Sequence, residues 1–62
     1  MKYIALCFDD GRCFAIKAEE ARAAFLREAY ASNFVGEFAN YKLAMAAIMA
    51  ALDKRGAGGG GR

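Results

Sequence analysis

The chain has 62 residues, of which 58% are apolar, and a formal net charge of +2. This length predicts one domain with a small core, and the apolar content excludes disorder over most of the chain. It has no His, Trp, Pro, Thr or Gln and a single Ser, Ser32, so it lacks the imidazole on which catalysis near neutral pH usually depends. The composition therefore predicts a protein that is not an enzyme and has no cofactor.

Residues 2–18, KYIALCFDDGRCFAIKA, predict a β-hairpin that bends at DDG. A two-residue turn would divide the large apolar side chains between the two faces of the hairpin. A three-residue loop over 9–11 pairs Cys7 with Cys13 and places Gly11 where the backbone requires a positive φ. We expect this second register because it collects the large apolar residues on one face. These residues are Ile4, Leu6, Phe8, Phe14 and Ile16.

In the expected register Cys7 and Cys13 lie directly opposite each other. Their Cβ atoms would be about 4.5–5.5 Å apart, slightly more than a disulfide usually spans but within reach of a small adjustment. Three interpretations stay open: two reduced thiols packed as small apolar residues, a cross-strand disulfide formed on oxidation, and a metal site. No metal is predicted, because two thiols would leave a tetrahedral site half empty.

Two helices are predicted after the hairpin. Residues 18–32, AEEARAAFLREAYAS, are rich in strong helix formers, and the helix is expected to end near Asn33. Its buried stripe should consist of Ala18, Ala21, Phe25 and Ala29, widened by Leu26 and Tyr30. A second helix is predicted over 34–55, where large apolar residues recur at alternating spacings of 4 and 3: Phe34, Phe38, Tyr41, Met45, Ile48 and Leu52.

The predicted fold class is α+β, with a two-stranded antiparallel hairpin followed by two helices (ββαα). It forms one domain over 1–55, and the composition of 56–62, GAGGGGR, predicts a flexible, disordered tail. The apolar hairpin face is expected to pack on the seam of the second helix. The longest apolar run, 43–52, is half of a membrane span, and residues 1–8 do not resemble an export signal. We therefore expect a cytoplasmic protein with no membrane partner.

The chain has more apolar surface than one hairpin and two helices can cover, and such surface usually marks an interface. The leading prediction is a small non-catalytic protein–protein interaction module, an inhibitor or adaptor that binds another protein or a second copy of itself. Phage and mobile-element inhibitors, anti-CRISPR proteins among them, have a comparable size and composition. The candidate contact residues are Tyr3, Asp9, Asp10, Arg12, Lys17, Glu19 and Glu20.

Two alternative functions follow from other features. The basic residues Lys54, Arg55 and Arg62 could follow nucleic-acid phosphates, assisted by Arg22 and Arg27. Residues 1–52 are neutral, however, with six acidic and six basic groups, whereas nucleic-acid binders usually concentrate basic charge on the folded part. The second alternative is a thiol switch, in which oxidation of the two cysteines stiffens the hairpin.

Overall fold

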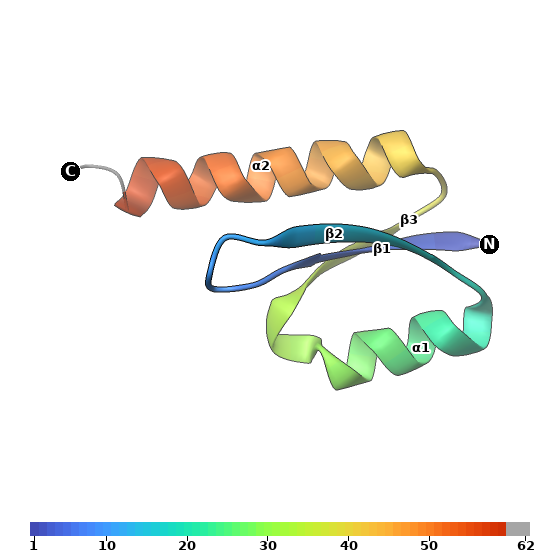
Figure 1. The fold of residues 1–62 in the computed structure, drawn as a ribbon. Coiled ribbons are helices and arrows are strands. Elements are labelled where there is room, and N and C mark those ends of the chain that lie inside the picture. The colour runs from blue at the N-terminus through green and yellow to red at the C-terminus, as the bar shows by residue number, and fades with distance from the viewer. Residues whose placement is uncertain (60–62) are drawn as a thin grey trace.

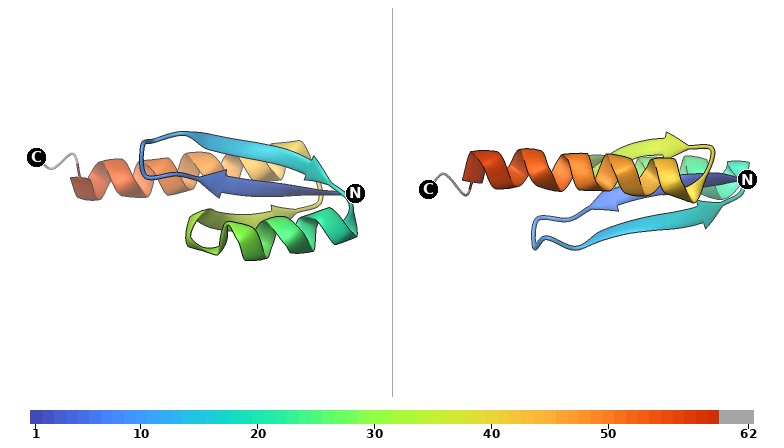
Figure 2. Two further views of the ribbon diagram at one scale, coloured as in Figure 1. Left: turned by 60° about the horizontal axis from the view of Figure 1, so that its bottom comes forward. Right: turned by 90° about the horizontal axis from the view of Figure 1, so that it is seen from above.

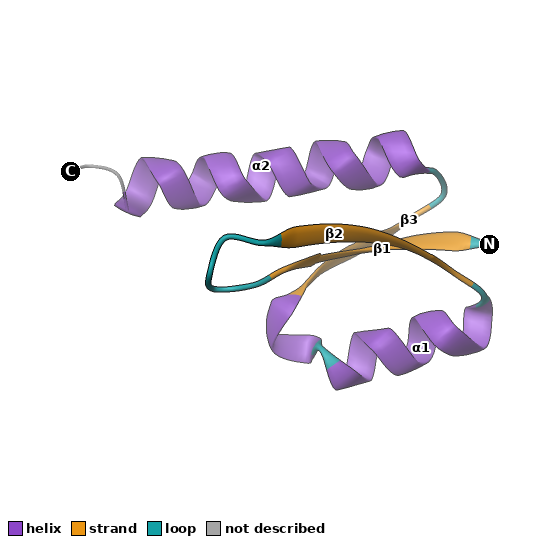
Figure 3. Ribbon diagram, viewed as in Figure 1, coloured by secondary structure: helices purple, strands orange, loops and turns teal. Residues whose placement is uncertain are grey.

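In a computed structural model, which describes residues 1–59, a three-stranded antiparallel sheet lies between two helices. Figure 1 shows α2 on one face of the sheet and α1 on the other, and Figure 3 shows the same view with helices and strands distinguished by colour. The predicted α+β class is confirmed. The elements in chain order are β1 (Lys2–Cys7), β2 (Cys13–Ala18), α1 (Glu20–Ala29), the 3-10 turn η1 (Ala31–Asn33), β3 (Phe34–Phe38) and α2 (Tyr41–Gly59).

The hairpin forms in the expected register. β1 and β2 pair without interruption from Lys2 opposite Ala18 to Cys7 opposite Cys13. The Phe8 N–H donates to the Arg12 carbonyl oxygen at 2.7 Å, and residues 9–11 form the loop. Gly11 has a φ of +94°, so the left-handed conformation expected at this position is confirmed.

Of the three interpretations of the cysteine pair, the structure has the cross-strand disulfide. Cys7 and Cys13 are bonded, and their Cα atoms are 4.0 Å apart. The disulfide closes the hairpin next to its loop, on the face that α2 covers.

The prediction of two strands is wrong, because residues 34–38 form a third strand and not the start of a helix. β3 pairs antiparallel with β1, which gives the strand order β2-β1-β3 and the element order ββαβα. Phe34, Val35 and Phe38 are of residue types that favour strands, and the free edge of β1 offers them a partner. Sheet pairing therefore outweighs the helical spacing of the two phenylalanines.

α2 begins at Tyr41, later than the predicted start of the second helix at 34. The Asn40 side-chain oxygen Oδ1 accepts a hydrogen bond from the Leu43 N–H at 2.9 Å, which satisfies a backbone donor of the first turn. The helix continues to Gly59, so it includes residues 56–59, which the sequence assigned to the tail. The remaining part of that tail, 60–62, lies outside the described residues.

β3 contains a bulge that sets which side chains face which helix. Ala5 pairs with Gly36 and Leu6 pairs with Phe34, so that Val35 is the extra residue. Phe34 packs with the core on the α1 side, whereas Val35 packs with the core on the α2 side. The short strand therefore contributes apolar side chains to both layers.

The central strand β1 is buried on both faces and divides the core in two. On the α1 side the buried residues are Ile4, Leu6, Ala18, Ala23 and Leu26. On the α2 side they are Ala5, Cys7, Ala44 and Ile48. The expectation that the face of Ile4 and Leu6 packs on the second helix is thus wrong. That face lies against α1, and α2 covers the opposite face, which carries Ala5 and Cys7.

Candidate functional site

The main candidate site is a groove beside α1, on the face of the hairpin that carries Phe8 and Phe14. It has a volume of about 360 Å³, and we call it the aromatic groove. The hairpin and α1, with the residue that follows the helix, supply its lining: Leu6, Phe8, Phe14, Ile16, Arg22, Leu26 and Tyr30.

The groove exists because α1 leaves part of the sheet uncovered. Arg27 of α1 reaches toward β3, where its Nη1 lies 3.2 Å from Glu37 Oε1. The outer strand β2 is therefore less covered on this face, and Phe14 remains 46% exposed. Figure 2 shows β2 at the margin of the sheet opposite β3.

The orientation of α1 also differs from the expected one. The helix buries Ala23 and Leu26, whereas Phe25, which the sequence placed in the buried stripe, is 65% exposed. Phe25 is three residues from Arg22, so the two side chains are neighbours on the helix surface. The observed orientation of α1 thus places the exposed Phe25 next to Arg22, which lines the groove.

Three rings pack at the end of the aromatic groove near the hairpin loop. The Phe8 ring lies 5.8 Å from the Phe14 ring and 5.9 Å from the Tyr30 ring, in both cases edge to face. This geometry is favourable for aromatic pairs, so the three rings stabilise one another's positions. Because Tyr30 is still 39% exposed, the cluster offers a preformed apolar surface.

Arg22 is the one charged residue among those that line the groove. Within residues 1–54, its guanidinium makes no ion pair and no side-chain hydrogen bond. An exposed arginine beside aromatic rings combines a planar set of donors with an apolar surface, which is a common composition of binding hot spots.

The structure places three of the seven predicted contact residues at the hairpin loop. Asp10 accepts a hydrogen bond from the Arg12 N–H through Oδ1 at 3.0 Å, and its Oδ2 lies 3.5 Å from Arg12 Nε. Asp9 is exposed in the same loop. The charges of Asp10 and Arg12 are therefore partly neutralised by their ion pair in the hairpin loop.

The other four predicted contact residues lie toward the opposite end of the sheet. Tyr3 is half-buried against the Tyr41 ring at 5.9 Å, and Lys17 is exposed on β2. The Glu19 carbonyl accepts the Ala23 N–H at the start of α1, and Glu20 lies 3.4 Å from Lys2 Nζ. A six-residue strand spans about 17 Å, so the two groups do not form one site. Their contact with a partner stays a prediction.

A cluster of charges that the sequence did not predict joins β1, β3 and α1. Glu37 lies 2.8 Å from Lys2 through Oε2 and also pairs with Arg27. The hydrogen bond from Lys2 lowers the pKa of Glu37, and the same bond raises the pKa of Lys2. These charges are paired with one another, so the cluster connects elements and leaves no carboxylate poised for chemistry.

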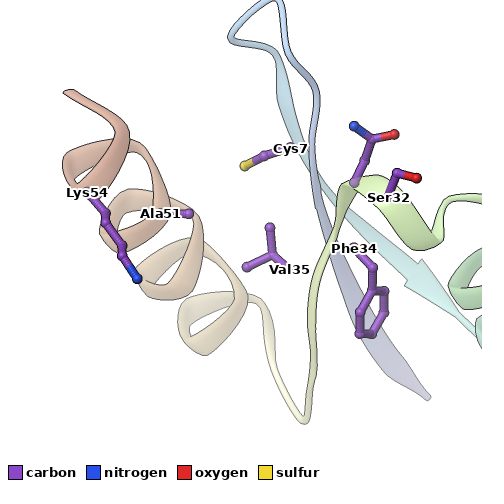
Figure 4. A pocket seen from close by; sticks show the side chains of 7 residues that line it. Cys7, Ser32, Phe34, Val35, Ala51 and Lys54 are labelled. Atoms are coloured by element: carbon purple, nitrogen blue, oxygen red, sulfur yellow. The ribbon is translucent and has the colours of Figure 1, made fainter. Parts of the chain in front are cut away.

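A second hollow, of about 370 Å³, lies between the start of β3 and α2 (Figure 4). Its lining residues are Cys7, Ser32, Asn33, Phe34, Val35, Ala51 and Lys54. Figure 4 shows Val35 pointing toward α2 and Phe34 pointing to the other side of the strand. The Ser32 hydroxyl has no hydrogen-bond partner within the described part of the chain, so no group activates it.

Apart from Arg22, which the sequence offered as a nucleic-acid contact, the residues that make the aromatic groove were visible in the sequence only as core candidates. Phe8, Phe14 and Tyr30 belong to the predicted apolar faces, and nothing local indicates that Phe14 stays half-exposed. Their placement depends on the position of α1 relative to the sheet. Among residues 1–59, no three His, Cys, Asp or Glu side chains gather in a way that could hold a metal ion.

Comparison with known proteins gives no match: no family model, no curated protein and no solved structure is similar to this chain. Neither helix within the part of the chain described is both long enough and apolar enough to cross a lipid bilayer.

Proposed function

We propose that this protein is a small non-catalytic binding module that docks another protein on the aromatic groove. The observation that supports the proposal is the cluster of Phe8, Phe14 and Tyr30 beside Arg22, which has no ion pair within residues 1–54. A few hot-spot residues dominate the binding energy at protein interfaces, and tyrosine and arginine are enriched among them. Such a module would act as an inhibitor or adaptor, of the kind that phages and mobile elements use, such as an anti-CRISPR protein.

The expected energies are consistent with a specific but compact interface. Full burial of an aromatic side chain contributes about 1.5–3 kcal/mol, and about 1.4 kcal/mol changes an affinity tenfold. A carboxylate in place of the Phe14 ring would remove this contribution and would be desolvated on binding. We therefore expect Phe14→Glu to weaken binding of the partner at least tenfold.

The test compares Phe14→Glu with Leu43→Glu, because Phe14 and Leu43 are both apolar and have similar exposure, 46% and 50%, but Leu43 lies on α2. Tagged wild-type and variant chains are used to capture proteins from nuclease-treated extract of the native cell. The wild type and Leu43→Glu should retain one stoichiometric protein that Phe14→Glu loses, with circular dichroism showing that both variants fold. Capture that Phe14→Glu leaves unchanged, or that nuclease abolishes, contradicts the proposal.

The disulfide supports a second proposal, a thiol switch on the same hairpin. Cys7 precedes Phe8 and Cys13 precedes Phe14, so the bond closes the strands that hold two of the three groove rings. We also propose a cytosolic location, where thiols usually stay reduced. Exchange with a small disulfide would then oxidise the two cysteines, release two small thiols and stiffen the hairpin. Differential alkylation of the cysteines in intact cells measures which form is present.

A further inference from the structure

The outer edge of β2 is a free strand edge next to the aromatic groove. Among residues 1–59, β2 has β1 as its one neighbour in the sheet. In an antiparallel ladder, residues alternate between pairs that exchange hydrogen bonds and pairs that do not. Because Phe8 and Arg12 are bonded, the N–H and C=O groups of Cys13, Ala15 and Lys17 point away from β1, along the open edge.

The two edges of the sheet are not equivalent. β2 has six residues and an uninterrupted ladder, whereas β3 has five residues and a bulge at Val35. A bulge twists an edge and disturbs the regular spacing that an added strand requires. The β2 edge is therefore the one that can accept another strand.

An added strand would reach the aromatic groove directly. Phe14 and Ile16 belong to β2 and also line the groove. Every second side chain of a strand beside β2 would lie on the same face as these two residues. Backbone hydrogen bonds would supply affinity, and the groove would select apolar side chains at alternate positions.

The charges at this edge favour an acidic segment over a second copy of the chain. Lys17 is exposed and has no ion pair within residues 1–54, and β2 contains no acidic residue. Pairing β2 with its own copy would bring a second Lys17 to the same edge without a carboxylate in the strand to neutralise it. A strand with acidic side chains removes this repulsion.

We propose that an extended acidic segment of another protein adds to the β2 edge as a fourth strand. Its alternate apolar side chains occupy the aromatic groove, and its carboxylates lie on the opposite face of the sheet, on the side of Lys17. This inference rests on the proposed function, since it assigns the chemistry of the partner that binds the same groove.

The test uses the full chain and a synthetic nine-residue peptide in which valine alternates with glutamate, measured by calorimetry and by NMR of the backbone amides. We expect saturable binding that shifts the N–H signals of Cys13, Ala15 and Lys17 more than those of β3. A peptide with lysine in place of glutamate should bind at least tenfold more weakly. A glutamate peptide N-methylated at alternate amides should lose binding, because it cannot pair as a strand.

Substitutions in the protein, in place of changes to the peptide, test the same proposal. Lys17→Gln should weaken binding of the glutamate peptide about fivefold, whereas Lys54→Gln, which removes a charge beside the start of β3, should leave it unchanged. Ala15→Pro should abolish binding, because it removes an outward N–H without breaking the pairing with β1. Should Ala15→Pro not fold, the N-methylated peptide on the wild-type chain answers the same question.

The outcomes separate this inference from the proposed function. If the captured partner depends on Phe14 but the glutamate peptide does not bind, or its N-methylated form binds equally well, strand addition is wrong and the groove proposal stands. If the partner does not depend on Phe14, the groove proposal itself is wrong. If sedimentation shows a dimer of the chain that Ala15→Pro dissociates, the occupant of the edge is a second copy and the inference is overturned.

Discussion

Gly36 and Phe38, two residues apart in β3, show how one close contact shapes the third strand. The Phe38 ring folds back over Gly36, and a Cβ at this glycine would lie 2.6 Å from Phe38 Cζ. The absence of a side chain at residue 36 thus lets the ring pack onto the α2-side core, where Phe38 contacts the buried cluster.

We predict that Gly36→Ala lowers the free energy of unfolding by about 1–2 kcal/mol, because the Phe38 ring must move out of its position. Urea denaturation measures the change. Phe38→Leu removes the ring that the new methyl group would meet, so the double variant should lose less stability than the sum of the two single changes. Strict additivity of the two effects would show that the contact does not constrain residue 36.

Glu37 makes stability depend on pH in a direction that its contacts determine. Lys2 lowers its pKa from the ordinary value of 4.5, so its contribution is present above that pH and is lost as pH falls through the lowered value. The raised pKa of Lys2 acts in the opposite direction, and its contribution is lost only above about pH 10.5.

We predict that wild type is more stable than Glu37→Gln at pH 7 and that the difference shrinks as the pH falls below the ordinary carboxyl pKa of 4.5. Urea denaturation at a series of acidic pH values and at pH 7 provides the measurement. A difference that does not shrink with falling pH would mean that the glutamine disturbs packing and not the charge cluster.

The role of a single residue could be predicted from the sequence where the contacts that select that residue lie close to it along the chain. Gly11 could be assigned because the loop length and the pairing of Phe8 with Arg12 both lie within a few residues of it. Gly36 could not, since its requirement comes from the way the Phe38 ring folds back. Arg22 and Phe14 could be assigned to the groove only once the position of α1 was known.

Among the elements, the hairpin was predicted in detail, and the third strand was mistaken for a helix. Phe34 and Phe38 fit the spacing of a helix face as well as one face of a strand, so the pattern alone is ambiguous. The deciding contact is the open edge of β1, far away in the sequence. Asn40, which accepts the Leu43 N–H, is the local signal that marks the true start of α2.

We predict that the double variant Cys7→Ala, Cys13→Ala is about 2 kcal/mol less stable than the oxidised wild type, because the disulfide closes a short loop in the unfolded chain. Thermal unfolding with and without a reductant tests this. The reductant should lower the midpoint of the wild type and leave that of the double variant unchanged. Equal midpoints for all four samples would show that the bond does not stabilise the hairpin.

For the whole molecule, the expected surplus of apolar surface is present: the apolar run 43–52 keeps Leu43 and Met49 exposed, whereas one hairpin face is covered. The hairpin face of Ala5 and Cys7 is covered by α2. The exposed large apolar residues are instead on the outer surfaces, with Phe14, Phe25 and Tyr30 around α1 and Tyr41, Leu43 and Met49 on α2. The sequence could give the amount of apolar surface, but its distribution depends on β3, which widens the sheet so that a helix packs on each face.

We predict that binding of the protein partner weakens less than tenfold between about 50 and 200 mM salt, since few exposed charge pairs contribute and apolar burial is not screened. A nucleic-acid complex with several phosphate contacts would lose about a thousandfold over the same range. Calorimetry or surface plasmon resonance across this range distinguishes the two. A steep loss would favour the alternative in which the basic C-terminal residues bind nucleic acid.

The position of β1 has a consequence for synthesis. β1, the central strand of the sheet, leaves the ribosome before its neighbour β3 and before α2, the helix that covers Ala5 and Cys7. The nascent hairpin therefore has one bare apolar face until Ala44 and Ile48 emerge. Final closure joins segments far apart along the chain, which is the slow kind of contact in small proteins.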